Sequence, residues 1–111
     1  MRVAVLGVGA IGGLIASRLA RAGSEVLLCA RGETAQALEA VGLLLDTPDG
    51  RTIALAPDRW TVLDTNQQDI PTEQQGWADY AILCGKSYDI PELCKIADKV
   101  LSLNGLAMCL P

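Results

Sequence analysis

The sequence has no histidine and little positive charge. Histidine is the commonest general acid or base and the commonest metal ligand, so its absence excludes most metal and acid-base sites. We therefore predict no metal site. Lysine and arginine together number 9 against 13 acidic residues, and the formal net charge is -4. A chain with this charge has no broad basic face for phosphate backbones, so we do not expect nucleic-acid binding.

Long uninterrupted hydrophobic runs are also missing. Glycines interrupt the apolar stretch near the amino terminus, and Arg18 and Arg21 follow it. This pattern fits neither a signal peptide nor a membrane span, so a cytoplasmic protein without a membrane partner is expected. The four cysteines lie far apart and form no C-x-x-C pair: Cys29, Cys84, Cys94 and Cys109. We interpret them as reduced core thiols.

The length and composition of the chain predict one folded domain. The chain has 111 residues, of which 50% are hydrophobic and 20% are charged. That size suits a single core but leaves no room for an elaborate active site of its own.

The first 30 residues have the pattern of a strand, a helix and a second strand. A continuous apolar run at 3–6 predicts a strand buried on both faces of a parallel sheet, and 25–30 predicts a second one. Helical spacing from Ala10 to Ala22 lies between them and ends at Gly23. The helix has one apolar face and an adjoining strip of small residues that lets it lie close to a sheet: Ile11, Ile15, Leu19 and Ala22, then Gly12, Ala16 and Ala20.

The rest of the chain continues this alternation. The expected elements are a helix at 33–41, a hairpin around 47–50, a strand at 80–84, a helix from Pro91 to about Leu101 and a strand at 106–110 after the turn Asn104-Gly105. The polar segment from Pro57 to Trp77 is expected to be a long loop or an insertion. Together these elements predict an α/β fold of the doubly wound Rossmann type, with a mainly parallel sheet and helices on both faces.

A glycine motif follows the first strand. Gly7-Val8-Gly9-Ala10-Ile11-Gly12 matches G-x-G-x-x-G, leaves a buried strand and opens a helix. The first glycine permits a tight turn, the second lets a pyrophosphate approach the backbone, and the third lets the helix pack on the sheet. We therefore predict that all six residues contact a dinucleotide. The alternative is a glycine-rich turn that serves packing alone.

The residue after the second strand bears on which dinucleotide binds. NAD-binding chains usually place a carboxylate there for the ribose 2′-hydroxyl, whereas this chain has Arg31. A guanidinium suits the 2′-phosphate of NADP, so Arg31 and NADPH are the predicted pair. Two alternatives remain, a solvated Arg31 and Glu33 as a ribose ligand.

Lys86 follows the strand at 80–84, at the edge of the sheet where ligands of α/β proteins collect. It is a candidate cofactor contact, and a solvated loop lysine is the alternative. Ser87 and Asp89 precede Pro91, where they could also act as helix caps.

Three segments together carry a family resemblance: Met1 to Gly13, Ala30-Arg31-Gly32, and Leu83-Cys84-Gly85-Lys86-Ser87-Tyr88-Asp89. With these segments in this order the chain resembles the amino-terminal domain of ketopantoate reductases. The resemblance implies NADPH-dependent reduction of the small 2-oxoacid 2-dehydropantoate to pantoate, on the route to pantothenate and coenzyme A. It also implies that the glycine motif holds the pyrophosphate, Arg31 the 2′-phosphate, and that Lys86 lies on the cofactor side.

The resemblance also shows what the chain does not contain. Members of the family continue into an Asn-containing turn and then a helical domain with the lysine acid and the substrate-binding residues. We therefore expect residues 1–111 to be an NADP-binding domain, a fragment with no catalytic residues of its own. The carboxy-terminal helical domain would be absent, and apolar surface that it normally covers could mediate self-association. The alternatives are the cofactor domain of another NADP-dependent dehydrogenase and a non-catalytic nucleotide-sensing module.

Overall fold

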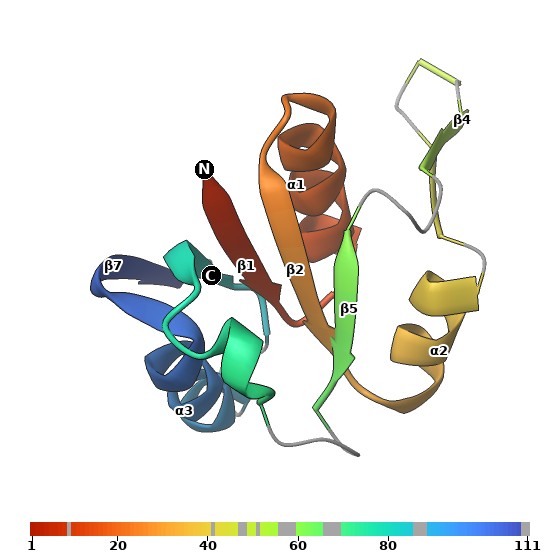
Figure 1. Cartoon of the computed structure of the whole chain (residues 1–111). Coiled ribbons are helices and arrows are strands. Elements are labelled where there is room, and N and C mark those ends of the chain that lie inside the picture. Colours follow the sequence, from red (N-terminus) through yellow and green to blue (C-terminus); the bar gives the residue numbers. More distant parts are fainter. Residues whose placement is uncertain are drawn as a thin grey trace.

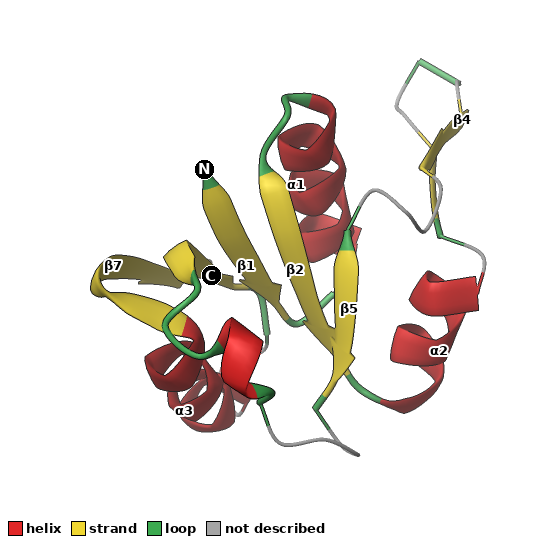
Figure 2. Cartoon of the chain, viewed as in Figure 1, coloured by secondary structure: helices red, strands yellow, loops and turns green. Residues whose placement is uncertain are grey.

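A five-stranded sheet forms the centre of the fold (Figures 1 and 2). The computed structural model describes residues 1–8, 10–40, 42–46, 49–50, 52–55, 60–65, 70–85 and 89–109. In spatial order the strands are β5 (Thr61–Asp64), β2 (Glu25–Ala30), β1 (Arg2–Leu6), β6 (Ala78–Leu83) and β7 (Leu101–Cys109). Every neighbouring pair is parallel, as the sequence predicts.

Helices cover both faces of this sheet, and each face has its own apolar core. The helices are α1 (Ala10–Arg21), α2 (Gly32–Ala40) and α3 (Ile90–Val100). Val3 and Val5 of β1 face a cluster with α1 and α2, whereas Ala4 and Leu6 face a cluster with α3. The doubly wound α/β prediction is thus confirmed. Among the described residues no helix is long and apolar enough to cross a membrane.

The face of α1 that packs on the sheet is the strip of small residues. Gly12, Ala16 and Ala20 are buried, whereas Ile11 is 56% exposed. Small side chains let the helix axis approach the sheet closely, so the larger apolar residues lie on its flank. The helix ends as predicted, because the Gly23 N–H donates to the Ala20 carbonyl oxygen at 3.1 Å.

Two shorter elements join α2 to the edge of the sheet. β3 (Leu43–Asp46) pairs antiparallel with β4 (Thr52–Leu55), which confirms the expected hairpin. Figure 1 shows this hairpin projecting from the rest of the chain.

The expectation of a long loop from Pro57 to Trp77 is wrong, because parts of this segment have regular secondary structure. It contains β5, which pairs with β2, and the short 3-10 helix η2 (Thr72–Gln74). Trp60, directly before β5, and Ile70, shortly before η2, are buried at 7% and 8% exposure. β5 is an edge strand, and only two of its four residues are apolar. Its sequence therefore lacks the continuous apolar run that indicates a buried strand.

β7 begins earlier than predicted. It starts directly after α3, with Leu101 opposite Ala78, and the next pair is Tyr80 with Leu106. β7 therefore carries surplus residues around Asn104, where the sequence predicts a turn before the strand. The part from Leu106 to Cys109 pairs with β6 as a regular strand, as expected.

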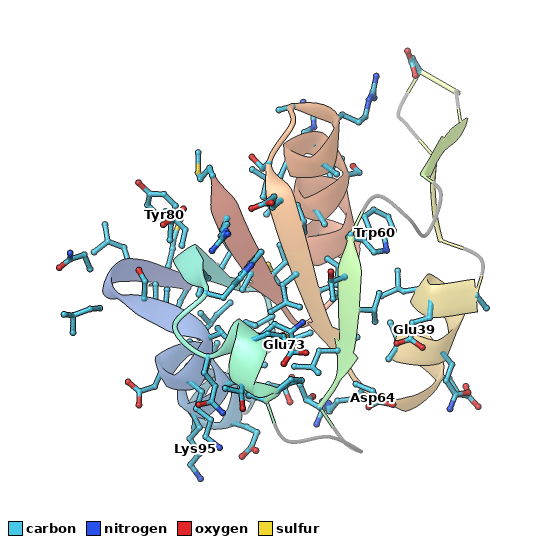
Figure 3. All side chains as sticks on the ribbon, in the orientation of Figure 1. Glu39, Trp60, Asp64, Glu73, Tyr80 and Lys95 are labelled. Carbon is cyan, nitrogen blue, oxygen red and sulfur yellow. The ribbon has the colours of Figure 1, made fainter. Side chains whose placement is uncertain are left out.

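An apolar surface lies over β6 and β7. Tyr80 and Leu106 are 43% and 65% exposed and sit opposite each other, and Met108, two residues further along the same side, is 59% exposed. Figure 3 shows Tyr80 at the periphery beside β7. Self-association through this surface stays a prediction.

Candidate functional site

The order of the strands fixes where a ligand can bind. The chain proceeds from β1 outward through β2 to β5, and then returns to the other side of β1 with β6 and β7. Ligands of open α/β sheets bind outside the carboxyl ends of the strands at the point where the order reverses. In this chain that point lies between β1 and β6, directly at the turn that carries the glycine motif.

At two of its glycines, Gly7 and Gly12, the turn is packed too closely to accept a side chain without strain. Gly7 has a φ of +87°, and a Cβ on it would lie 3.2 Å from the backbone nitrogen of Gly85. A Cβ on Gly12 would lie 2.5 Å from the carbonyl oxygen of Gly7. Hydrogen bonds hold the turn on both sides, from Gly7 N–H to Cys29 O at 3.0 Å and from Cys84 N–H to Leu6 O at 2.8 Å.

The glycine turn leads into the amino-terminal end of α1, where an anion can bind. The first four N–H groups of a helix have no partner within the helix, and the helix dipole places partial positive charge there. The first turn of α1 contains no acidic residue that would repel a phosphate. Val8 precedes it half-buried, Ala10 begins it and the exposed Ile11 follows, whereas Gly9 lies outside the described residues. The backbone present thus fits a pyrophosphate.

Arg31 lies between β2 and α2 and is part of an ion pair. Its Nη2 is 3.5 Å from Oδ1 of Asp89, and the side chains are 61% and 21% exposed. Asp89 occupies the N-cap position of α3 but makes no side-chain cap hydrogen bond, so its predicted capping role is wrong in that respect. The sequence alone does not predict this pair, because the pair depends on the order of the strands in the sheet.

Asp64 is a second acidic residue near Arg31 in the fold. It ends β5, and its Oδ1 accepts a hydrogen bond from the Gly32 N–H, the first residue of α2, at 3.2 Å. Figure 3 shows Asp64 and Trp60 at opposite ends of β5. This contact was not predicted, because it depends on β5, which the sequence did not indicate as a strand. Glu33 is exposed in the first turn of α2.

Lys86 and Ser87 lie outside the described residues, so their predicted roles stay predictions. Gly85, just before them, is described and packs against the start of α3: a Cβ on it would lie 2.9 Å from the Cβ of Asp89. Gly85 is therefore held between the glycine turn and α3.

The cysteines differ in their surroundings. Cys29 is buried and Cys84 half-buried, as core thiols should be, but Cys94 and Cys109 are exposed and that part of the prediction is wrong. Burial raises the pKa of the Cys29 thiol to about 12 from its ordinary 9.0, and it also raises the pKa of Cys84. Neither thiol is a ready thiolate nucleophile at neutral pH.

The raised pKa of Cys29 predicts a loss of stability at alkaline pH. Because the folded-state pKa lies above the unfolded one, the unfolded chain releases this proton first. The contribution of the protonated Cys29 thiol to the free energy of unfolding is intact below pH 9. Between pH 9 and pH 12 it falls by up to about 1.4 kcal/mol per pH unit. Urea unfolding across this range should show a steeper fall for the native chain than for Cys29→Ala. Identical slopes would contradict the prediction.

Comparisons with known proteins agree on one family. A family model described as ketopantoate reductase PanE/ApbA matches residues 3–110. A 2-dehydropantoate 2-reductase from Mesorhizobium japonicum is 35% identical over 99 residues, 87% of this chain and 27% of that protein. A crystal structure of a PanE/ApbA family ketopantoate reductase from Ralstonia eutropha JMP134 is 35% identical with a TM-score of 0.74, covering 96% of this chain and 33% of that one.

A third relative shares the fold at lower identity. D-mandelate dehydrogenase, solved with NADH and anilino(oxo)acetate, superposes with a TM-score of 0.79 at 20% identity, covering 99% of this chain and 33% of that one. The chain thus spans about a quarter to a third of the length of these relatives.

Proposed function

The chain belongs to the ketopantoate reductase family PanE/ApbA, and from this premise we propose that residues 1–111 form an NADPH-binding domain. One observation carries the proposal: the turn that opens α1 has two glycines, Gly7 and Gly12, without space for a side chain, and it lies where the strand order reverses. There the backbone of the six motif residues would hold the pyrophosphate. Those residues are Gly7, Val8, Gly9, Ala10, Ile11 and Gly12.

We further propose that the ribose end of the cofactor is recognised by Arg31. Its side chain is 61% exposed at the carboxyl end of β2, so it is accessible to a ligand. A planar guanidinium can form two parallel charge-assisted hydrogen bonds to a phosphate, which supports NADPH over NADH. Lys86, which follows β6 in the sequence, remains a proposed cofactor contact.

The reaction proposed for the whole protein is reduction of 2-dehydropantoate to pantoate. The bound nicotinamide would supply a hydride to the ketone carbon. The alkoxide that forms needs a proton donor and a site closed to water. We propose that a helical domain outside residues 1–111 provides both, because the relatives are about three to four times as long as this chain. Without that domain, the chain would bind the cofactor but not catalyse the reaction.

A paired titration tests the cofactor assignment. We expect NADPH to bind the chain saturably and more tightly than NADH, as followed by nicotinamide fluorescence or calorimetry. In the same preparation, addition of 2-dehydropantoate should cause no NADPH oxidation above the rate without protein. Failure of both cofactors to bind would refute the proposal and leave a fold assignment only. Substantial turnover would show instead that the catalytic groups lie within these residues.

A further inference from the structure

The ion pair between Arg31 and Asp89 spans the place where the cofactor is proposed to bind. Arg31 follows β2 and Asp89 follows β6, and β1 lies between these two strands in the sheet. The pair therefore connects the two sides of the point where the strand order reverses. It passes close to the glycine turn, because Asp89 packs on Gly85 and Gly85 packs on Gly7.

Asp89 lies at the start of α3, where it meets Arg31. Its backbone is helical at φ -85° and ψ -20°, and its carboxylate makes no cap hydrogen bond to α3. The carboxylate lies at the positive end of the helix dipole. It is 21% exposed, whereas Arg31 is 61% exposed, so the arginine is the more accessible member of the pair.

We propose that Asp89 is a specificity-determining residue that competes with the 2′-phosphate of NADPH for the Arg31 guanidinium. This inference rests on the proposed function, since it assumes that Arg31 recognises that phosphate. The Asp89 carboxylate occupies Nη2 of the guanidinium, so a phosphate that binds both ends of the Arg31 fork must displace it. NADH carries a hydroxyl at that position and leaves the ion pair intact. Asp89 therefore weakens NADPH binding selectively and lowers the preference for NADPH over NADH.

The expected size of the effect follows from the geometry. The ion pair is 3.5 Å long and more than half exposed on the arginine side. Ion pairs between exposed side chains typically change an equilibrium constant by roughly 1.4- to 5-fold. Removing the carboxylate should therefore tighten binding of a 2′-phosphorylated nucleotide by about that factor.

The test compares two adenosine nucleotides that differ at the ribose 2′ position. Adenosine 2′,5′-bisphosphate and 5′-AMP are titrated calorimetrically into the native chain and into Asp89→Asn. Asparagine is also a good N-cap residue, so α3 should be retained, and thermal unfolding checks this. We expect tighter binding of the bisphosphate to Asp89→Asn by roughly 1.4- to 5-fold, and no change for 5′-AMP.

Two further variants separate this effect from a general change of charge. Asp98→Asn removes the same charge from an exposed position nine residues further along α3, about 13 Å away along the helix, and should leave bisphosphate binding unchanged. In the Arg31→Ala background, Asp89→Asn should have no effect on either nucleotide. Equal tightening of both nucleotides, or the same effect without Arg31, would overturn the inference while leaving the proposed function intact. If the native chain binds neither NADPH nor the bisphosphate, the proposed function fails, and the inference fails with it.

Discussion

Replacing Gly12 with alanine is expected to weaken NADPH binding by about 100-fold or more. The new Cβ would lie 2.5 Å from the carbonyl oxygen of Gly7 and 3.4 Å from the Cβ of Cys84. The first of these atoms belongs to the backbone, so α1 must move away from the turn. A pyrophosphate that loses about two charge-assisted hydrogen bonds, each worth about 1.5 to 3 kcal/mol, binds about 100-fold more weakly or worse. Overpacking of this kind should also lower the free energy of unfolding by about 1 to 3 kcal/mol.

A second glycine on the other end of α1 provides the control for lost stability. Gly23 has a φ of +95° with open space around it, so Gly23→Ala strains the backbone without touching the glycine turn. It should lower the free energy of unfolding by about 1 kcal/mol and leave NADPH affinity unchanged. Both variants are compared by urea unfolding and by titration with NADPH. Near-native affinity of Gly12→Ala, or an equal loss of affinity in Gly23→Ala, would contradict the role given to the turn.

The first half of the sheet could be predicted because its local signals agree. The run at 3–6 is continuously apolar, the helix after it has a strip of small residues, and 25–30 repeats the apolar run. In the structure these segments form β1, α1 and β2, with bounds that match to within one residue. The strip of small residues also predicted the close approach of α1 to the sheet, but the helical periodicity placed Ile11 on the apolar face. Ile11 is nevertheless exposed in the structure, because only small side chains such as those of Gly12 and Ala16 allow the helix to approach the sheet closely.

The missed features depend on contacts between distant segments. β5 has only Val62 and Leu63 as apolar residues, and it is a strand because the edge of β2 is available to pair with it. Asp64 contacts Gly32 for the same reason. The sequence predicts Arg31 as a cationic group after β2, but the pair with Asp89 requires the strand order. Local chemistry thus identified the candidate site, and topology determined which charges meet there.

Replacing Arg31 with alanine should weaken NADPH binding by roughly 10- to 150-fold and leave NADH binding almost unchanged. A charge-assisted contact to the 2′-phosphate is worth about 1.5 to 3 kcal/mol, and that free energy gives this range. NADH has no charged group at the 2′ position, so it loses no such contact.

The matched control for this charge change is Arg21→Ala. Arg21 is exposed and ends α1, at the opposite end of that helix from the glycine turn. Long-range attraction between the protein and the phosphates would be reduced in both variants, whereas a direct contact is removed only in Arg31→Ala. Titrations at low and high salt separate the two contributions, because salt screens the long-range one more strongly. Equal losses of affinity for NADPH and NADH in Arg31→Ala would mean that the guanidinium does not recognise the 2′-phosphate. Equal losses of NADPH affinity in Arg31→Ala and Arg21→Ala would mean the same. Selectivity for NADPH would then have to arise elsewhere along the carboxyl edge of the sheet.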